Sequence, residues 1–278
     1  MSVGQDDDEV EIELDAVQVG VAAGVGRVTR AGSRAGGLLD RRVLVGPIDP
    51  CGECDVCRRG GAAVCPLARR RTELGASAIA AARWLVPLGD GLELPVPAAA
   101  AVAGDVALAY TLYARTGVGP REPVVVVGGS PVARFLIEIL IAKAIAPTAM
   151  ADPGPWADWL HGKGVAVARD REALIAALAA QSLGTKPWRV LCADPAASAA
   201  AVELAGPRAT LTLLAGAAAQ PISGDALARE VTIIGVAGAH PDLMVEVAAM
   251  CAKREIDLIA GTAGDATDPL RTHVRAIR

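Results

Sequence analysis

Four cysteines lie within a stretch of fifteen residues, and their spacing is that of a metal site. Cys51, Cys54, Cys57 and Cys65 follow the pattern C-x2-C-x2-C-x7-C. Four thiolates suit a tetrahedral zinc ion, and each C-x2-C step lets one turn present two sulfurs to the same ion. Because four ligands leave no open coordination position, the sequence predicts one structural zinc ion per chain. A pair of disulfides or a set of free surface thiols is the alternative.

Length and composition limit the classes of protein to consider. The chain has 278 residues, 53% of them hydrophobic, which is enough for a large core and for two domains. A net charge of −4 argues against a nucleic-acid partner, because binding to phosphates requires clustered Lys and Arg. The start of the chain is acidic, which argues against a signal peptide. The richest apolar run, residues 96–114, is interrupted by Asp105, which argues against a membrane span. We therefore expect a cytoplasmic protein without membrane association, where a cysteine cluster favours metal over disulfides.

The first third of the chain has the pattern of β-structure around the cysteines. Residues 9–17 alternate between apolar and mostly acidic side chains, which predicts a half-buried strand. Residues 19–32 and 41–47 are two further candidate strands before the cysteine cluster. Residues 94–117 then form an apolar helical segment that contains Asp105.

The rest of the chain has the pattern of a parallel sheet. A Gly- and Pro-rich segment, 117–123, indicates a domain boundary. Four consecutive valines at 124–127 predict a strand buried on both faces, as in parallel sheets. Ala-rich helical segments alternate with further candidate strands, which predicts an α/β fold with a doubly wound, Rossmann-type parallel sheet. These strands are 148–152, 164–168, 188–194, 209–216 and 231–238. An amphipathic helix is expected at 241–256, and the last ~20 residues have only a weak pattern.

The turn after the four valines occupies the place of a dinucleotide fingerprint, G-x-G-x-x-G/A. Its residues are Gly128, Gly129, Ser130, Pro131, Val132 and Ala133. The first glycine of the motif is needed for the tight turn and is kept, whereas the second, which lets the backbone approach a pyrophosphate, is replaced by Ser130. Asp152 ends the next candidate strand, close to where a carboxylate would bind the ribose hydroxyl of NAD.

Two outcomes stay open for this turn. NAD(P) binds, with Asp152 favouring NAD, or the Rossmann fold is kept without a nucleotide. The side chain of Ser130 intrudes where a phosphate comes closest, and Trp156 with two prolines follows Asp152, which supports the second outcome.

The segment GPIDPCGECDVCRRGGAAVCP (46–66) resembles the structural-zinc lobe of the medium-chain dehydrogenase/reductase superfamily, the zinc alcohol dehydrogenases. Residues 22–47 resemble the strand, turn and strand that lead into that lobe. The resemblance implies a reduced GroES-like β domain at 1–116 with the zinc lobe at 47–72. It also implies a Rossmann domain at 117–245 and a C-terminal helix and tail, 246–278, returning towards the first domain. A homodimer is implied as well, in which strands such as 231–238 pair edge to edge.

The same resemblance implies a catalytic zinc for which the sequence lacks ligands. Gly20 stands where two ligands and the loop between them are expected, and the third ligand position falls at Asp105. The hydroxyl of the family's proton relay falls at Ala109, with Tyr110 and Tyr113 nearby. The final helix and strand with which the family returns to its catalytic domain are not recognisable in the sequence.

These observations lead to a principal hypothesis and two alternatives. The first is a degenerate homologue with structural zinc but no catalytic zinc, acting as a binding, scaffold or regulatory protein and forming a homodimer or binding another protein. The alternative is an active NAD(P)-dependent oxidoreductase that works without catalytic zinc, with Asp105, Tyr110 and Tyr113 as candidate catalytic residues. A third hypothesis is a nucleotide site reused for another ligand, such as an acyl-CoA. The sequence does not indicate a substrate.

Overall fold

Strand β1 (Glu9–Gln18) is the centre of the first sheet, and its alternating sequence explains why. Val10, Ile12 and Leu14 are fully buried, while the intervening acidic residues are half-buried. β1 pairs in antiparallel fashion with β2 (Gly24–Ala31), β6 (Ser77–Ala81) and β15 (Thr272–Ala276). The buried side chains of β1, β2, β3 (Arg42–Val45) and β6 form one hydrophobic core, as expected for a sheet with one apolar face. The strand predicted at 9–17 is confirmed.

We describe a computed structural model that covers residues 7–89, 92–181, 184, 186–216, 224–258, 262–263 and 268–277. The chain divides into two compact units, one made of 1–108 with 239–278 and the other of 109–238. The domain boundaries expected from the sequence, 116/117 and 245/246, stay predictions.

The sheet of the first unit has the strand order β14-β15-β1-β2-β3-β7, with β6 also on β1. β7 is Val86–Pro87 and β14 is Thr262–Ala263. The expectation that the chain lacks a final strand is wrong, since β15 pairs with β1 through Gln18 and Val274. Only Thr272 and Val274 of β15 are buried, so the strand is too short to show a clear period in the sequence.

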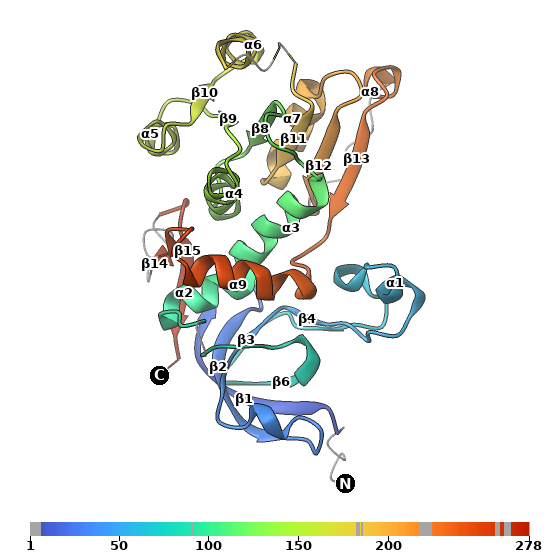
Figure 1. The fold of residues 1–278 in the computed structure, drawn as a ribbon, viewed down its shortest axis with the longest axis vertical. Helices are drawn as coiled ribbons and strands as arrows, with labels where there is room; N and C mark the ends of the chain where they lie inside the picture. Colours follow the sequence, from blue (N-terminus) through green and yellow to red (C-terminus); the bar gives the residue numbers. More distant parts are fainter. Residues whose placement is uncertain are drawn as a thin grey trace. The chain divides into compact units, whose positions relative to one another are not determined.

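The cysteine lobe is an excursion between β4 (Ile48–Asp49) and β5 (Arg69–Arg70), which pair with each other in antiparallel fashion. Between them lie the short helix α1 (Asp55–Arg58) and a 3₁₀ turn at Ala62–Val64. The two-stranded pair therefore brings the ends of the lobe together at its base (Figure 1).

The apolar helical segment is continuous. It comprises α2 (Val96–Ala101), a π-helical turn at Val102–Val106 and α3 (Ala107–Thr116). By length and composition, Val96–Thr116 could cross a membrane, but 78% of its most apolar window is buried within the protein. It therefore has the burial of a core helix. Helix α9 (Met244–Ala252), which falls within the predicted helix at 241–256, belongs to the first unit.

The second unit contains a parallel sheet of order β10-β9-β8-β11-β12-β13 (Figure 1). Numbered within this unit the order is 3-2-1-4-5-6, the doubly wound Rossmann arrangement. The strands are β8 (Val124–Val127), β9 (Pro147–Met150), β10 (Ala166–Ala168), β11 (Arg189–Cys192), β12 (Thr210–Leu214) and β13 (Thr232–Val236). The helices are α4 (Pro131–Ala142), α5 (Pro155–Gly162), α6 (Arg171–Ala180), α7 (Ser198–Leu204) and α8 (Gly224–Ala228). All four valines of β8 are buried, and the predicted fold class is confirmed.

Candidate functional site

The four cysteines of the lobe converge on one point. All four Sγ atoms lie within 4.8 Å of one another. The distance between the Sγ atoms is 4.0 Å for Cys51 and Cys57 and 3.6 Å for Cys51 and Cys65. It is 3.8 Å for Cys54 and Cys65. A tetrahedral ion with Zn–S bonds of about 2.3 Å requires sulfurs about 3.8 Å apart. The spacing thus fits a structural zinc and is too long for disulfides, and all six cysteines of the chain are free.

Backbone groups of the lobe also point at the sulfurs. The N–H of Cys54 lies 3.4 Å from the Sγ of Cys51, and the N–H of Cys51 lies 3.5 Å from the Sγ of Cys65. The N–H groups of Glu53 and Cys54 lower the pKa of the Cys51 thiol to about 6. Burial, followed by the neighbouring thiols, raises the pKa of Cys57 to about 12. A zinc ion bound here therefore has to displace protons, so its affinity falls with falling pH.

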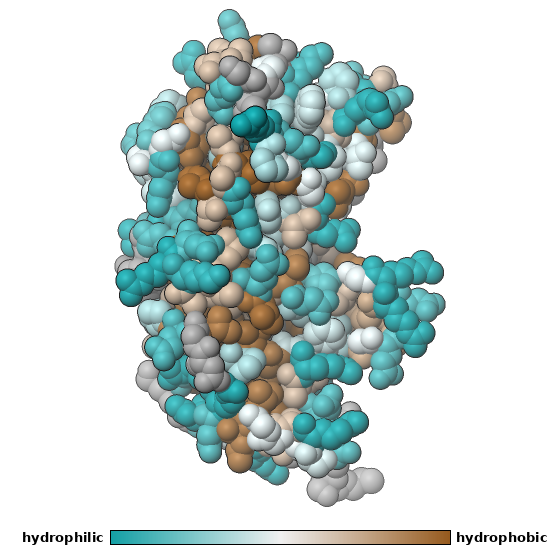
Figure 2. Space-filling model, viewed as in Figure 1, coloured by the Kyte–Doolittle hydropathy of each residue, from teal (hydrophilic) through white to brown (hydrophobic). Residues whose placement is uncertain are grey.

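Few apolar side chains hold the lobe together. In the segment 51–68, the buried side chains are Ala62, Ala63 and Cys65. Figure 2 shows a mostly hydrophilic surface around α1. Nε2 of His240, which precedes α9, lies 2.7 Å from the carbonyl oxygen of Gly60 and adds a contact from another part of the first unit. A metal ion held by the four cysteines would thus take the place of a hydrophobic core in this segment.

The base of the lobe is fixed by a buried ion pair that the sequence analysis missed. Arg71 binds both carboxylate oxygens of Asp49, and both side chains are less than 9% exposed. Arg71 also donates to the carbonyls of Gly46 and Ile79, while Asp49 accepts from the N–H of Ala81. A run of three arginines suggests a solvated face, and only the tertiary structure shows that its last member is interior.

Two side chains following β6 hold the backbone next to the first ligand. Arg83 donates to the carbonyl of Cys51 over 2.8 Å, and the indole N–H of Trp84 donates to the carbonyl of Pro50 over 2.7 Å. They fix the direction in which the chain enters the cluster, which is how outer-shell contacts orient metal ligands.

The other two cysteines lie apart from the cluster. Cys192 and Cys251 are buried, as expected for small hydrophobic side chains. Burial raises the pKa of Cys192 to about 11, so its thiol stays protonated at neutral pH.

The predicted nucleotide turn lies between β8 and α4, at the carboxyl end of the parallel sheet. Gly128 has a φ of +112°, and a Cβ atom there would lie 2.5 Å from the Cβ of Asp194, so only glycine fits. The hydroxyl of Ser130 donates to the carbonyl of Ala193 over 3.0 Å and accepts from the N–H of Ala133 over 3.2 Å. Asp152 is exposed after β9. Gly128 thus provides the tight turn that the fingerprint requires. The side chain of Ser130 caps the N-terminus of α4.

The candidate catalytic residue Asp105 is interior. It lies in the π-helical turn, is 8% exposed, and accepts a hydrogen bond of 2.6 Å from the hydroxyl of Thr272 on β15. The backbone N–H of Asp105 donates to the side-chain oxygen of Gln18 over 3.1 Å. Burial raises the pKa of the Asp105 carboxyl, and side-chain hydrogen bonds from Thr272 and Gln18, together with the charge of His273, oppose this rise. Asp105 therefore joins the helical segment to β1 and β15.

The tyrosine candidates differ in exposure. Tyr110 is 2% exposed and Tyr113 is half-buried, with 5.6 Å between their ring centroids. The ring of Tyr110 also faces the ammonium group of Lys143 at 5.7 Å. Tyr113 is thus the more accessible of the two hydroxyl candidates.

Gly20, the position at which two catalytic ligands are expected, lies beside a cavity of about 440 Å³ in the first unit. It has a φ of +79°, and a Cβ atom placed on it would have no neighbour within 4 Å. The cavity is also lined by Gln18, Glu73 and Arg275. In the described part of the chain, the four lobe cysteines form the one group of three or more His, Cys, Asp or Glu side chains close enough to share an ion.

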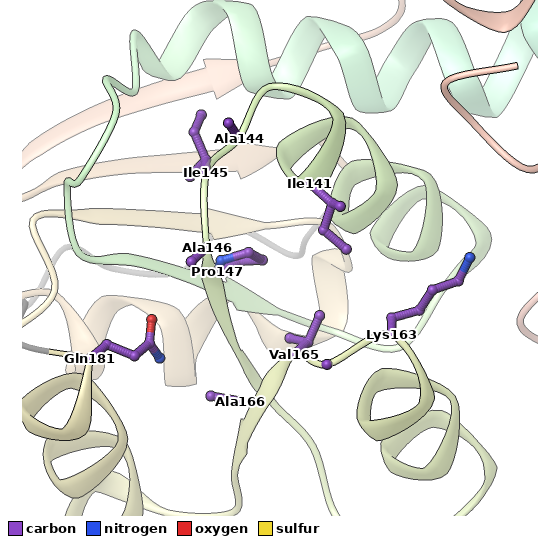
Figure 3. Close-up of a pocket in the computed structure, with 10 residues that line it drawn as sticks. Ile141, Ala144, Ile145, Ala146, Pro147, Lys163, Val165, Ala166 and Gln181 are labelled. Atoms are coloured by element: carbon purple, nitrogen blue, oxygen red, sulfur yellow. The ribbon is translucent and has the colours of Figure 1, made fainter.

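A second cavity, of about 380 Å³, lies in the second unit at the amino ends of β9 and β10, opposite the glycine turn. Figure 3 shows Ile141, Ile145 and Val165 around it, with Gln181 and Lys163 at its margins. Its mostly apolar lining does not suit the phosphates of a nucleotide.

Comparisons with known proteins give structural but no sequence matches. No protein-family model matches the chain, and no curated protein matches it either. A structure described as a short-chain alcohol dehydrogenase from E. coli CFT073, complexed with NADH, is similar at a TM-score of 0.80 and 15% identity, covering 97% of this chain and 92% of that one. An alcohol dehydrogenase from Thermus sp. ATN1 has the same TM-score and identity, with 93% and 86% covered. A protein described as a zinc-binding dehydrogenase from Sinorhizobium meliloti 1021, bound to NADP, has a TM-score of 0.78 and 14% identity, with 98% and 93% covered.

Proposed function

We propose that this chain, which has the fold of the zinc-binding, medium-chain alcohol dehydrogenases, is a non-catalytic homologue of them that keeps the structural zinc and acts as a binding or scaffold protein. The cysteine cluster supplies the zinc site. Six free cysteines suit the reducing cytoplasm, where we place the protein.

The observation that carries this proposal is that Asp105 is buried and that Gly20 has no side chain, since both stand at expected positions of catalytic zinc ligands. A catalytic zinc needs three protein ligands and one open position. Gly20 has no side chain to offer, and Asp105, the remaining expected ligand, is buried and hydrogen-bonded to Thr272. Polarising an alcohol or carbonyl needs a metal ion or a placed acid. A carboxyl enclosed between a helix and a strand supplies neither to a substrate.

The alternative of an active oxidoreductase without catalytic zinc has less support. Two of its three candidate residues, Asp105 and Tyr110, are buried, and Tyr113 alone is accessible. A tyrosine can donate a proton, but the substrate must reach its hydroxyl within hydrogen-bond distance.

Metal analysis and turnover assays test the proposal. Purified protein should contain one zinc ion per chain by mass spectrometry and should not oxidise or reduce alcohols, aldehydes or enones with either nicotinamide cofactor. Cys57→Ser should lower the zinc content, which shows that the counted ion is the one in the lobe. A second zinc ion in each chain, or turnover above that of a Tyr113→Phe control, would contradict the proposal.

We further propose a homodimer formed through β13. This strand is at the edge of the parallel sheet. Thr232 donates its N–H to Ala209 of the neighbouring segment, so by alternation Gly235 directs its N–H to the open edge. Gly235→Pro removes that donor without breaking the internal ladder. Gly235→Ala keeps the donor and meets no atom within 4 Å, which makes it the matched control.

Light scattering after gel filtration measures the result. Wild type and Gly235→Ala should elute as dimers and Gly235→Pro as a monomer with an unchanged zinc content. A monomeric wild type, or a Gly235→Pro variant that stays dimeric, would contradict this arrangement.

A further inference from the structure

Helix α4 begins at the glycine turn, but few of its first N–H groups are available to a ligand. Pro131 has no N–H. The N–H of Ala133 donates to the hydroxyl of Ser130, and the N–H of Arg134 donates to the carbonyl of Ser130 over 3.0 Å. Among residues 131–134, this leaves the backbone N–H of Val132 for a ligand, and Val132 is only 7% exposed. A pyrophosphate at a Rossmann turn is held by such N–H groups, so this turn offers it little.

The indole of Trp156, at the start of α5, lies directly on the turn. Its Cδ1 atom would be 3.2 Å from a Cβ atom built on Gly129. Dinucleotide binding requires a pyrophosphate to approach this same backbone to hydrogen-bond distance. The indole and the pyrophosphate therefore compete for one surface. The indole N–H is buried without a hydrogen-bond partner in the described part of the chain, so packing alone keeps the ring in place.

The packing that holds Trp156 is extensive. Its ring stacks on Trp159 with 5.1 Å between centroids and an interplanar angle of 10°. The ring of Trp159 in turn contacts the guanidinium of Arg134 at 4.9 Å and the ammonium of Lys163 at 5.6 Å. Arg134 belongs to α4 itself, so the stack is attached to the helix whose start it covers.

We infer that the turn at 128–133 is closed to dinucleotides by the chain's own Trp156, with Ser130 and Pro131 withdrawing the donors that a pyrophosphate needs. The fold implies a dinucleotide at this place, and these residues do not fit it. Trp156 is thus the residue that determines what the turn accepts.

Calorimetric titration of the zinc-loaded full chain with NADH and with NADPH tests this inference. Three proteins are compared: the wild type, a Ser130→Gly/Pro131→Val double variant, and the triple variant that adds Trp156→Ala. The double variant restores the donors under the indole, and the triple variant also removes the indole. We expect the triple variant to bind at least one of the two cofactors about tenfold or more tightly than both other proteins, which is the scale of one or two recovered hydrogen bonds to a charged group.

The matched control is a second triple variant, in which the double variant carries Trp188→Ala instead of Trp156→Ala. Trp188 is 58% exposed and lies before β11, so its removal leaves the indole of Trp156 in place. This control should bind like the double variant. A folded triple variant with less than a tenfold gain over the wild type overturns the inference, and so does a double variant or control that binds as tightly as the triple variant. If the triple variant has no melting transition and is therefore unfolded, the single variant Trp156→Ala is titrated in its place. It should then bind one of the cofactors at least tenfold more tightly than the wild type.

This inference stands apart from the proposed function, and the two fail differently. Cofactor binding by the wild type without turnover would overturn the closed turn and leave the non-catalytic assignment intact. A second zinc ion per chain would overturn that assignment and leave the turn unaffected.

Discussion

Replacing Cys57 by Ser should unfold the lobe while the sheet at its base persists. The segment 51–68 buries only two alanine methyl groups and Cys65, and two methyl groups are worth about 1.6 kcal/mol. Ordering the backbone of this segment costs about 18 kcal/mol at about 1 kcal/mol per residue. Structural zinc binds comparable small sites with a standard free energy (1 M zinc) of about 10–16 kcal/mol, and the upper end of that range offsets most of this cost. The fold of the lobe therefore depends on the fourth sulfur.

Two measurements follow from this estimate. Backbone amides of 51–68 should lose their protection from hydrogen exchange in Cys57→Ser, while those of β1 and β2 keep theirs. At free zinc about 1,000 times the dissociation constant, the bound ion contributes about 4 kcal/mol. Its loss should lower the melting temperature by about 10 °C.

A chelator and a second cysteine variant provide the controls. Chelation should reproduce the effect in the wild type and add nothing in Cys57→Ser. Cys192→Ser, which changes a buried cysteine outside the cluster, should keep the zinc content. If Cys57→Ser retains the metal, the amide protection and the melting temperature of the wild type, the cluster is not a structural zinc site.

Three further perturbations test the interior of each unit. Because burial raises the pKa of Asp105 above its unfolded value, the folded state holds the proton more tightly and stability falls as pH rises between the two values. Asp105→Asn should therefore gain stability relative to wild type as the pH rises above about 4, by up to about 1.4 kcal/mol per pH unit; a urea-midpoint difference that is independent of pH would contradict this. Arg71→Met leaves the Asp49 carboxylate buried without its partner and should cost about 3–5 kcal/mol in chemical denaturation, whereas a loss below about 1 kcal/mol would show that the pair is dispensable. Ser130→Ala removes the cap of α4 and should cost about 1 kcal/mol, with Ser130→Gly costing less; equal losses would argue against the capping bond.

The sequence determined those features that depend on local spacing and on periodicity. C-x2-C steps place sulfurs within reach of one ion through a single turn, so the cluster could be predicted from the chain alone. The alternation of β1 and the four valines of β8 likewise encode which faces are buried, and this distinguished the antiparallel from the parallel sheet.

The tertiary structure decided those features that depend on contacts between distant residues. Arg71 is buried because it pairs with Asp49, and nothing in the run of arginines predicts this. Residues 272–276 form a strand because they pair with β1, although their own sequence has no clear alternation. Trp156 packs against Gly129, although the two residues belong to consecutive βα units. They meet because β8 and β9 are neighbours in the sheet. A side chain's partners are set by the packing of the whole unit, so its role at the glycine turn cannot be derived from spacing along the chain.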